Sequence, residues 1–329
     1  MARLAAAFGT SHSPALNSPA EDFSGHAERD TRYAGHLDRN GVPVTYAQLL
    51  AAADPALADQ CRPEVIAARV AACAAHLDRL AAAIAAARLD ALVIVGDDQR
   101  EQYHDDNMPA FLVYCGETIA NAPLELPAGA PEYWRRARSV YHEPVARRDY
   151  PVAAGLAQHL VERLIEAEFD VASARTLRHA RGEGHAFGFV HRRLMPGDPI
   201  PVVPIVVNTY YPPNQPRPRR CLALGRALRA AIDSWPQDAR IGVIASGGLS
   251  HFTVDEALDR AVLDACARGD GDALGSLPPA KLNSGSSEIR NWIVTAGAAA
   301  GLATVWQEYV PLYRTPAGTG CGMAFAVWG

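Results

Sequence analysis

The sequence predicts an α/β protein with a mostly parallel, doubly wound central sheet flanked by helices. Short apolar runs that end in polar or glycine-rich turns recur along the chain, as buried strands do. Longer amphipathic segments alternate with these runs, which is the pattern of crossover helices between parallel strands. No break in composition marks a second domain, so we expect residues 1–329 to form a single domain.

The expected strands are apolar runs of five or six residues. The first is too short for a secretory signal, and a polar turn follows it at once. Ligands bind at the carboxyl ends of strands in doubly wound sheets, so polar residues that directly follow a strand are favoured as functional. In chain order the runs are Leu4–Phe8, Ala91–Val95, Ala110–Tyr114, Val202–Val207, Ile241–Ala245 and Met323–Val327.

The expected helices are longer segments, and the first of them is alanine-rich with an apolar stripe opposite a charged face. The longest apolar stretch, Trp292–Trp306, is shorter than the ~20 residues that a membrane helix needs. Its alanine and glycine content suits an interior helix running into a strand, so we expect no membrane association. The helices are Pro63–Leu89, Val152–Glu168, Cys221–Ile232, Val254–Cys266 and Glu288–Ala300.

Two long stretches lack a clear period. Asn17–Asp59 is rich in charged and small residues, and we expect it to form a lid-like insertion after the first strand. Gly116–Arg148 is rich in proline and acidic residues. Segments of this length in a compact domain are often covers over functional sites.

Composition narrows the choice of partners and compartment. The net charge is −5, and apart from short clusters such as Arg217–Arg220 no basic block stands out. We therefore expect no nucleic-acid partner, because phosphate binding needs a concentrated basic face. The six cysteines form no CxxC pair, which argues against a cysteine zinc site. So few cysteines in a long chain favour a reducing, cytoplasmic compartment over a disulfide framework.

Histidine and acidic residues follow the first two expected strands. His12 in GTSHSP could bind a divalent metal at the edge of the sheet, or could cap a turn. The second strand runs into GDDQREQYHDD, whose oxygen-rich side chains and His104 suit iron or manganese. The alternative is a solvated acidic loop. Position directly after the strand favours Asp98 and Gln99.

Three further motifs offer polar side chains. His185 in GEGHAFGF is an acid/base candidate, or a structural histidine in a mobile loop. In ASGGLSHF a pairing of Ser250 with His251 does not match the hydrolase pattern GxSxG. Glu288 in NSGSSEIRNW either interacts with a helix dipole or binds metal.

The segment VVNTYYPPNQP follows the fourth expected strand and combines polar and aromatic side chains. They could contact a planar substrate, or the segment could simply be a rigid exit from the strand. The residues concerned are Asn208, Thr209, Tyr210 and Tyr211.

Taken together, these motifs resemble the class III extradiol ring-cleavage dioxygenases, the family of the protocatechuate 4,5-dioxygenase catalytic subunit and gallate dioxygenase. The similar segments run in family order over nearly the whole chain. They are GTSHSP, VIVGDDQ…MPAF, GHAFGF, VPIVVNTYYPPNQPRPRRC, IASGGLSHF, GSSEIRNW and VPLYRTPAGTG. The segments GDDQREQYHDDNMPAF, NTYYPPNQP and SGSSEIRNW are most similar to the 3-O-methylgallate dioxygenase branch.

The resemblance implies a single catalytic domain that opens a catechol- or gallate-type aromatic acid, with 3-O-methylgallate one candidate, and inserts both atoms of O₂. It implies Fe(II), with manganese the alternative, bound by His12 and Glu288. The family's second histidine ligand is replaced by Gln99, so Gln99 itself, Asp98 or His104 is expected to complete the site.

The resemblance also assigns the remaining roles. His185 is expected to relay protons, Tyr210 to stand where the family has a second acid/base histidine, and His251 to lie at the site periphery. Substrate contacts are expected from the neighbouring Asn208, Thr209 and Tyr211. Self-association is expected because family members assemble.

Because Gln99 departs from the family pattern, two alternatives stay open. One is a member of the same fold that binds or stores metal and is not an oxygenase. The other is a metal-assisted hydrolase that uses the carboxylates of Asp97–Asp106 and needs no O₂.

Overall fold

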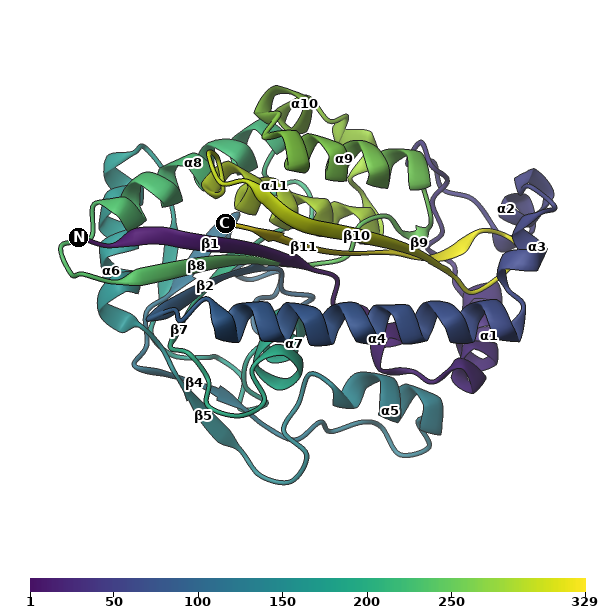
Figure 1. Ribbon diagram of the computed structural model, residues 1–329. Coiled ribbons are helices and arrows are strands. Elements are labelled where there is room, and N and C mark those ends of the chain that lie inside the picture. Colours follow the sequence, from purple (N-terminus) through teal and green to yellow (C-terminus); the bar gives the residue numbers. More distant parts are fainter.

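A nine-stranded sheet divides the molecule, and helices cover both of its faces (Figure 1). The computed structural model describes residues 1–329. The strand order is β10-β11-β1-β8-β2-β7-β3-β6, and β9 pairs with β11. The strands are β1 (Arg3–Thr10), β2 (Ala91–Gly96), β3 (Phe111–Tyr114), β6 (Ala172–Ala174), β7 (Val202–Val207), β8 (Arg240–Ser246), β9 (His251–Thr253), β10 (Thr304–Tyr313) and β11 (Thr319–Trp328). A separate ribbon pairs β4 (Thr118–Asn121) with β5 (Arg148–Pro151).

The α/β class is confirmed, but the sheet is mixed rather than mostly parallel. Only the central strands β1, β8, β2 and β7 run parallel to their neighbours as a continuous group. β11 is antiparallel to β1, β9 and β10, and β3 is antiparallel to β7. The turn between β10 and β11 is too short for the helical crossover that a parallel pair requires, so those two strands must be antiparallel.

Helices pack on both sides because successive residues of the central strands face opposite layers. On β2, Val93 belongs to the core layer that contains buried residues of α6, α8, α9 and α11, whereas Ile94 belongs to the opposite layer, which contains those of α4. The helices are α1 (Phe23–Arg32), α2 (Tyr46–Ala52), α3 (Leu57–Gln60), α4 (Pro63–Ala86), α5 (Glu132–Ser139), α6 (Ala154–Glu166), α7 (His185–Phe189), α8 (Pro218–Asp233), α9 (Glu256–Arg268), α10 (Gly271–Gly275) and α11 (Ile289–Ala298). Short helical turns cover Pro14–Asn17, Ala20–Asp22, Val190–Leu194, Pro279–Lys281 and Ser284–Glu288.

Every strand and helix expected from the sequence coincides with an observed element. The two aperiodic stretches also contain elements: residues 17–59 hold α1, α2 and most of α3, and residues 116–148 hold β4 and α5. The buried positions of α1 are Phe23, His26 and Asp30, at helical spacing. Two of these three residues are polar, so the sequence shows no apolar stripe there.

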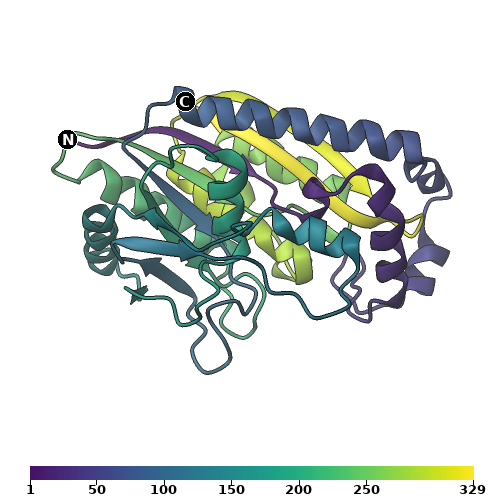
Figure 2. The ribbon, with the colours of Figure 1, turned by 90° about the horizontal axis from the view of Figure 1, so that it is seen from below.

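One helix from each stretch, α1 and α5, lies beyond the carboxyl ends of the parallel strands (Figures 1 and 2). Arg136 of α5 forms a two-point ion pair with Asp22, just before α1, with N–O distances of 2.7 and 2.8 Å. The insertions therefore stand at the edge of the sheet where ligands bind in α/β proteins. No helix in the protein combines the length and the apolar character required to cross a membrane.

Candidate metal centre

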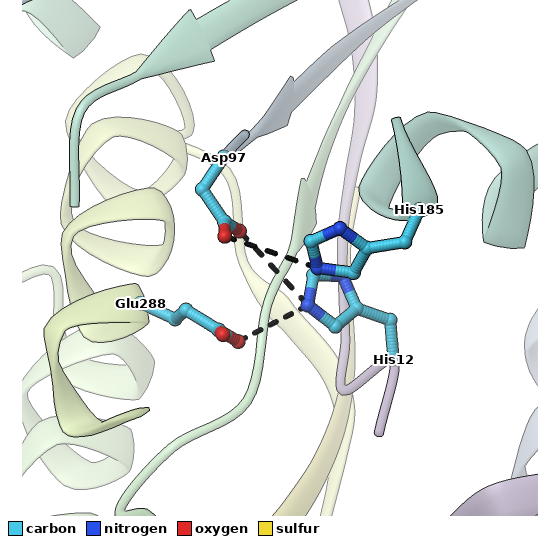
Figure 3. Close-up of side chains that lie close together, drawn as sticks. All are labelled: His12, Asp97, His185 and Glu288. Carbon is cyan, nitrogen blue, oxygen red and sulfur yellow. Dashed lines mark ion pairs between the residues drawn. The ribbon is translucent and has the colours of Figure 1, made fainter. Parts of the chain in front are cut away.

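Four buried side chains meet at the carboxyl edge of the sheet (Figure 3). His12 lies just after β1, Asp97 follows β2, His185 begins α7, and Glu288 ends the helical turn before α11. One ligand atom from each lies within 4.8 Å of all the others. The Nε2 atom of His12 is 3.1 Å from Glu288 Oε2 and 3.9 Å from Asp97 Oδ1, and His185 Nε2 is 3.9 Å from Asp97 Oδ2.

The orientation of His12 is set by Ser246, the last residue of β8. The Ser246 hydroxyl donates to the Ala186 carbonyl at 2.7 Å, so its oxygen accepts from His12 Nδ1–H at 3.0 Å. A proton on Nδ1 leaves a lone pair on Nε2, the nitrogen that faces the other three side chains. His12 is thus prepared as a ligand through Nε2.

The orientation of His185 is set in the same way by Glu101. Glu101 Oε2 lies 2.7 Å from His185 Nδ1, and the carboxylate also accepts the His185 backbone N–H at 3.1 Å. Burial opposes ionisation of Glu101, but the charge of His185 outweighs it and lowers the pKa of Glu101 to about 2. A carboxylate behind a histidine fixes its tautomer and increases its basicity, as is common at metal sites.

The two carboxyl groups of the cluster differ in their surroundings. Glu288 Oε2 accepts the Gly248 backbone N–H at 2.6 Å, and burial is outweighed by His251 and His12, which keep the pKa of Glu288 well below its usual range. Burial and the charge of Glu288 raise the pKa of Asp97 well above its usual range. A bound cation would favour the ionised form of Asp97.

His251 and Tyr210 form the outer side of the cluster. The Tyr210 hydroxyl donates to Glu288 Oε1 at 3.1 Å and lies 3.3 Å from His251 Nε2. Both ring nitrogens of His251 face acceptors, because Nδ1 lies 3.0 Å from the Leu249 carbonyl and Nε2 3.3 Å from Glu288 Oε1. Burial opposes a charge on His251, yet Glu288 raises the pKa of His251 well above its usual value.

The cluster suits a divalent metal ion. His12 Nε2, His185 Nε2 and Asp97 Oδ2 are buried and have no hydrogen-bond partner, a costly state for polar atoms. Ligands that lie about 2.1 Å from one ion are roughly 3.0 to 4.2 Å apart, which covers the observed separations of 3.1 and 3.9 Å. Two imidazoles with a carboxylate and open positions are the donor set of non-haem Fe(II) oxygenases.

The residues predicted to bind metal are divided between two regions. His12 and Glu288 belong to the cluster, and Gln99 lies beside it, where its Nε2 donates to Glu288 Oε1 at 3.2 Å. Asp98 lies outside and accepts the backbone N–H groups of the next turn at 2.9 Å. His104 packs edge-on against His179, with ring centres 5.0 Å apart.

A cavity of about 140 Å³ opens onto the cluster. A cavity of ~150 Å³ holds one benzene ring, so this space suits a single aromatic ring with small substituents. Of the other predicted catalytic and substrate-binding residues, His185, Tyr210 and His251 line it. Asn208 instead closes its own turn through two bonds to the Tyr211 backbone, and Tyr211 stacks under Arg100 at 4.7 Å. Thr209 is buried outside the cavity lining.

Some residues of the site were missed by sequence reasoning. Asp97 was noted as an acidic residue, but Asp98 and Gln99 were favoured over it. Ser246 and Tyr141 carried no signal, although the Tyr141 hydroxyl donates to the His12 carbonyl at 2.6 Å. Glu101 has the only visible hint, its place in the polar segment after β2.

The chain is similar to known aromatic ring-opening dioxygenases. Residues 46–323 match the family described as the catalytic LigB subunit of aromatic ring-opening dioxygenase. Gallate dioxygenase of Pseudomonas putida is 36 % identical over 110 residues, which is 32 % of this chain and 31 % of that protein. The 2,3-dihydroxyphenylpropionate/2,3-dihydroxicinnamic acid 1,2-dioxygenase of Comamonas testosteroni is 31 % identical over 176 residues, which is 51 % of this chain and 47 % of that protein.

The matched regions span less than half the length of either relative. The family match is broader and covers most of the chain, from before α4 into β11. It contains Asp97, His185 and Glu288, while His12 precedes it. The chain therefore belongs to the family of the catalytic LigB subunit of aromatic ring-opening dioxygenases.

Proposed function

We propose that the protein is a class III extradiol dioxygenase that opens the ring of a catechol- or gallate-type aromatic acid. Both atoms of O₂ enter the ring-opened product, so the reaction needs no external reductant. The observation that carries this proposal is the buried cluster of two histidines and two carboxylates at the base of a cavity the size of one ring. Among substrates, 3-O-methylgallate is the candidate suggested by the sequence resemblance.

In this proposal His12, His185 and Glu288 hold Fe(II), or Mn(II), with Asp97 as a further oxygen ligand. When bound, the ion supplies Lewis acidity and the activation of oxygen. His185 thus takes the part of second histidine ligand, in place of the proton relay expected from the sequence. Gln99 then orients Glu288 through its hydrogen bond of 3.2 Å rather than binding metal.

Proton handling falls to His251 and Tyr210 at the wall of the cavity. His251 can hold a proton on Nε2, which lies between the Tyr210 hydroxyl and Glu288. Burial and the charge of Glu288 raise the pKa of Tyr210 well above its usual value, so its hydroxyl remains a donor. A substrate hydroxyl in the cavity would lie near two proton donors, the Tyr210 hydroxyl and the His251 imidazole.

The non-oxygenase and hydrolase alternatives depended on the lack of a second histidine ligand. The position of His185, with Nε2 turned toward Asp97 at 3.9 Å and Glu101 behind it, supports an oxygenase site instead. The acidic segment Asp97–Asp106 contributes only Asp97 to the cluster, which leaves few carboxylates for a hydrolytic site.

We further propose that residues 17–59 act as a lid over the cavity. His26 and Arg29 of α1 line the same cavity as the candidate metal ligands. Self-association and a cytoplasmic location remain predictions from the resemblance and the cysteine pattern, and analytical ultracentrifugation would test the first.

Oxygen consumption by anaerobically iron-loaded protein tests the proposed function. We expect uptake with 3-O-methylgallate, gallate or protocatechuate, and at least a ~100-fold loss of rate in His12→Ala, His185→Ala and Glu288→Ala, because each change removes a ligand. His104→Ala is the matched control and should retain its activity. Iron content is measured in parallel.

The same experiment separates the alternatives. Loss of activity in His104→Ala with retention in His185→Ala would overturn the ligand assignment. Bound iron without uptake of O₂ on any catechol, together with metal-dependent hydrolysis in the absence of O₂, would overturn the dioxygenase proposal in favour of the hydrolase.

A further inference from the structure

We propose that the outer part of the cavity is a carboxylate-binding subsite formed by Arg138 and Arg314, with Arg29 at its rim. The subsite would select ring substrates that carry an acidic group. This inference rests on the proposed function for the reaction at the ring, and it deepens that function by naming the residues that recognise the acid.

Three segments that are distant in sequence bring arginines to the same cavity. Arg29 comes from α1, Arg138 from α5, and Arg314 follows β10. Arg29 stacks on the Trp134 ring, with its guanidinium carbon 4.2 Å from the ring centre. The cavity is therefore lined by aromatic and cationic side chains as well as by residues of the candidate metal centre.

Arg314 is held by a hydrogen bond from its Nε atom, while its Nη2 atom has no partner. Its Nε donates to Asp30 Oδ2 at 2.7 Å, and Thr319 Oγ1 donates to the same oxygen at 2.6 Å. Only 10 % of the Arg314 side chain is exposed, and its buried Nη2 has no hydrogen-bond partner. A buried donor held in this way is costly unless a ligand accepts from it.

Arg138 also has an unused donor. Its buried Nε has no hydrogen-bond partner, and no carboxylate lies within ion-pairing distance of the guanidinium. The guanidinium carbon is 5.7 Å from the ring centres of both Trp134 and Tyr141, so aromatic faces rather than anions surround it. Arg138 thus offers an unpaired donor at the cavity wall.

The positive charge of the neighbouring Arg314 affects the protonation of His26. The Nε2 atom of His26 is 2.9 Å from Ser18 Oγ. Burial and the nearby charge of Arg314 lower the pKa of His26 to about 4. His26 is therefore neutral at neutral pH and leaves the positive charge to the arginines. A planar guanidinium matches a planar carboxylate through paired hydrogen bonds, which favours a carboxylate as the bound group.

Tyr141 lies next to both the metal ligands and Arg138. Its ring centre is 5.7 Å from the ring of His185, and its hydroxyl donates to the His12 carbonyl at 2.6 Å. The Arg138 guanidinium lies on the same ring at 5.7 Å. Tyr141 thus lies near both the candidate metal centre and Arg138, so a single-ring substrate in this cavity could place hydroxyls at the centre and its acid group at the arginines.

The test compares protocatechuate with its methyl ester, which keeps the ring hydroxyls and removes the charge. We expect Arg138→Gln and Arg314→Gln to lower kcat/KM for the acid by about 10- to 100-fold, the usual effect of losing a hydrogen bond to a charged group. The ester should change by no more than about twofold, and Arg138→Lys should restore part of the acid preference.

Arg135→Gln is the matched control. Arg135 lies on α5 with Arg138, is exposed, and donates only to the Ala130 and Pro127 carbonyls, at 3.1 and 3.3 Å. Its substitution should leave both substrates unaffected. Equal losses for acid and ester in Arg138→Gln and Arg314→Gln would overturn the subsite, as would no loss for either.

Calorimetric titration of metal-free protein with both compounds separates this inference from the proposed function. Tighter binding of the acid than of the ester, lost in the two arginine variants, would support the subsite even if no catechol were oxidised. Ring opening without any arginine-dependent preference for the acid would leave the proposed function intact and overturn the subsite.

Discussion

Each histidine of the candidate metal centre is held by a partner on its far nitrogen. Nδ1 of His12 forms a hydrogen bond with Ser246, and Nδ1 of His185 forms one with Glu101. Both partners are buried or nearly so, and both direct Nε2 toward the same point. We therefore expect the two residues to act on a bound metal through the ligands, without contacting it themselves.

Glu101→Gln tests this positioning role. The amide can still accept from His185 Nδ1–H, but it removes the negative charge that increases the basicity of the imidazole. We expect metal affinity to fall about 10- to 100-fold, the usual effect of changing such a partner. Competition with a chromophoric chelator measures it. Exposed Glu117→Gln is the control, and unchanged affinity in a folded Glu101→Gln variant would contradict the role.

At the scale of elements, the crossing of α8 and α11 positions Glu288. α11 starts at the residue after Glu288, and Trp292 Nε1 on this helix donates to the Gly247 carbonyl at 2.8 Å. The two helices approach closely because Gly225 of α8 faces Gly297 of α11. A methyl group at Gly225 would lie 2.0 Å from the Val294 carbonyl oxygen, so α11 would have to move.

Gly225→Ala should therefore lower the free energy of unfolding by about 1–3 kcal/mol, as overpacking of a close contact does. Gly155→Ala on α6 is the matched control, because no atom lies within 4 Å of the added methyl group. It should raise stability by roughly 0.5–1 kcal/mol, since alanine loses less entropy in a helix. Urea denaturation measures both, and equal stability of the two variants would contradict the packing argument.

At the scale of the whole molecule, the cavity lies where the sheet edge meets two insertions. The candidate metal ligands come from the ends of strands and from helical segments at this edge. Residues 17–59 supply His26 and Arg29 to the cavity, and residues 116–148 supply Trp134 and Arg138. A rigid edge thus carries the reacting groups, while the surrounding helices carry groups suited to recognising the rest of a substrate.

If residues 17–59 act as a lid, ligand binding should slow their exchange with solvent. We expect protocatechuate to protect amides of α1 by at least about tenfold in hydrogen exchange, because opening of the segment would then require loss of the ligand. The far helix α10 serves as an internal control. Protection confined to the metal ligands, with none in α1, would contradict the lid.

The sequence by itself determined the α/β class and the position of every element that buries a regular apolar stripe or run, such as β7 and α4. These signals are local, because the periods of strands and helices are visible within one segment. His12 and Glu288 were likewise placed correctly as neighbours of strand and helix ends, and the motifs resembled the family that the chain matches.

The tertiary structure alone decided what depends on contacts between distant segments. It placed antiparallel pairs on both sides of the parallel group, and it turned Asp97 rather than Asp98 toward His12. It also brought Arg138 and Arg314 to one cavity. Local patterns do not specify which side of a turn faces a partner that is distant in the sequence, because packing of the complete chain fixes that direction.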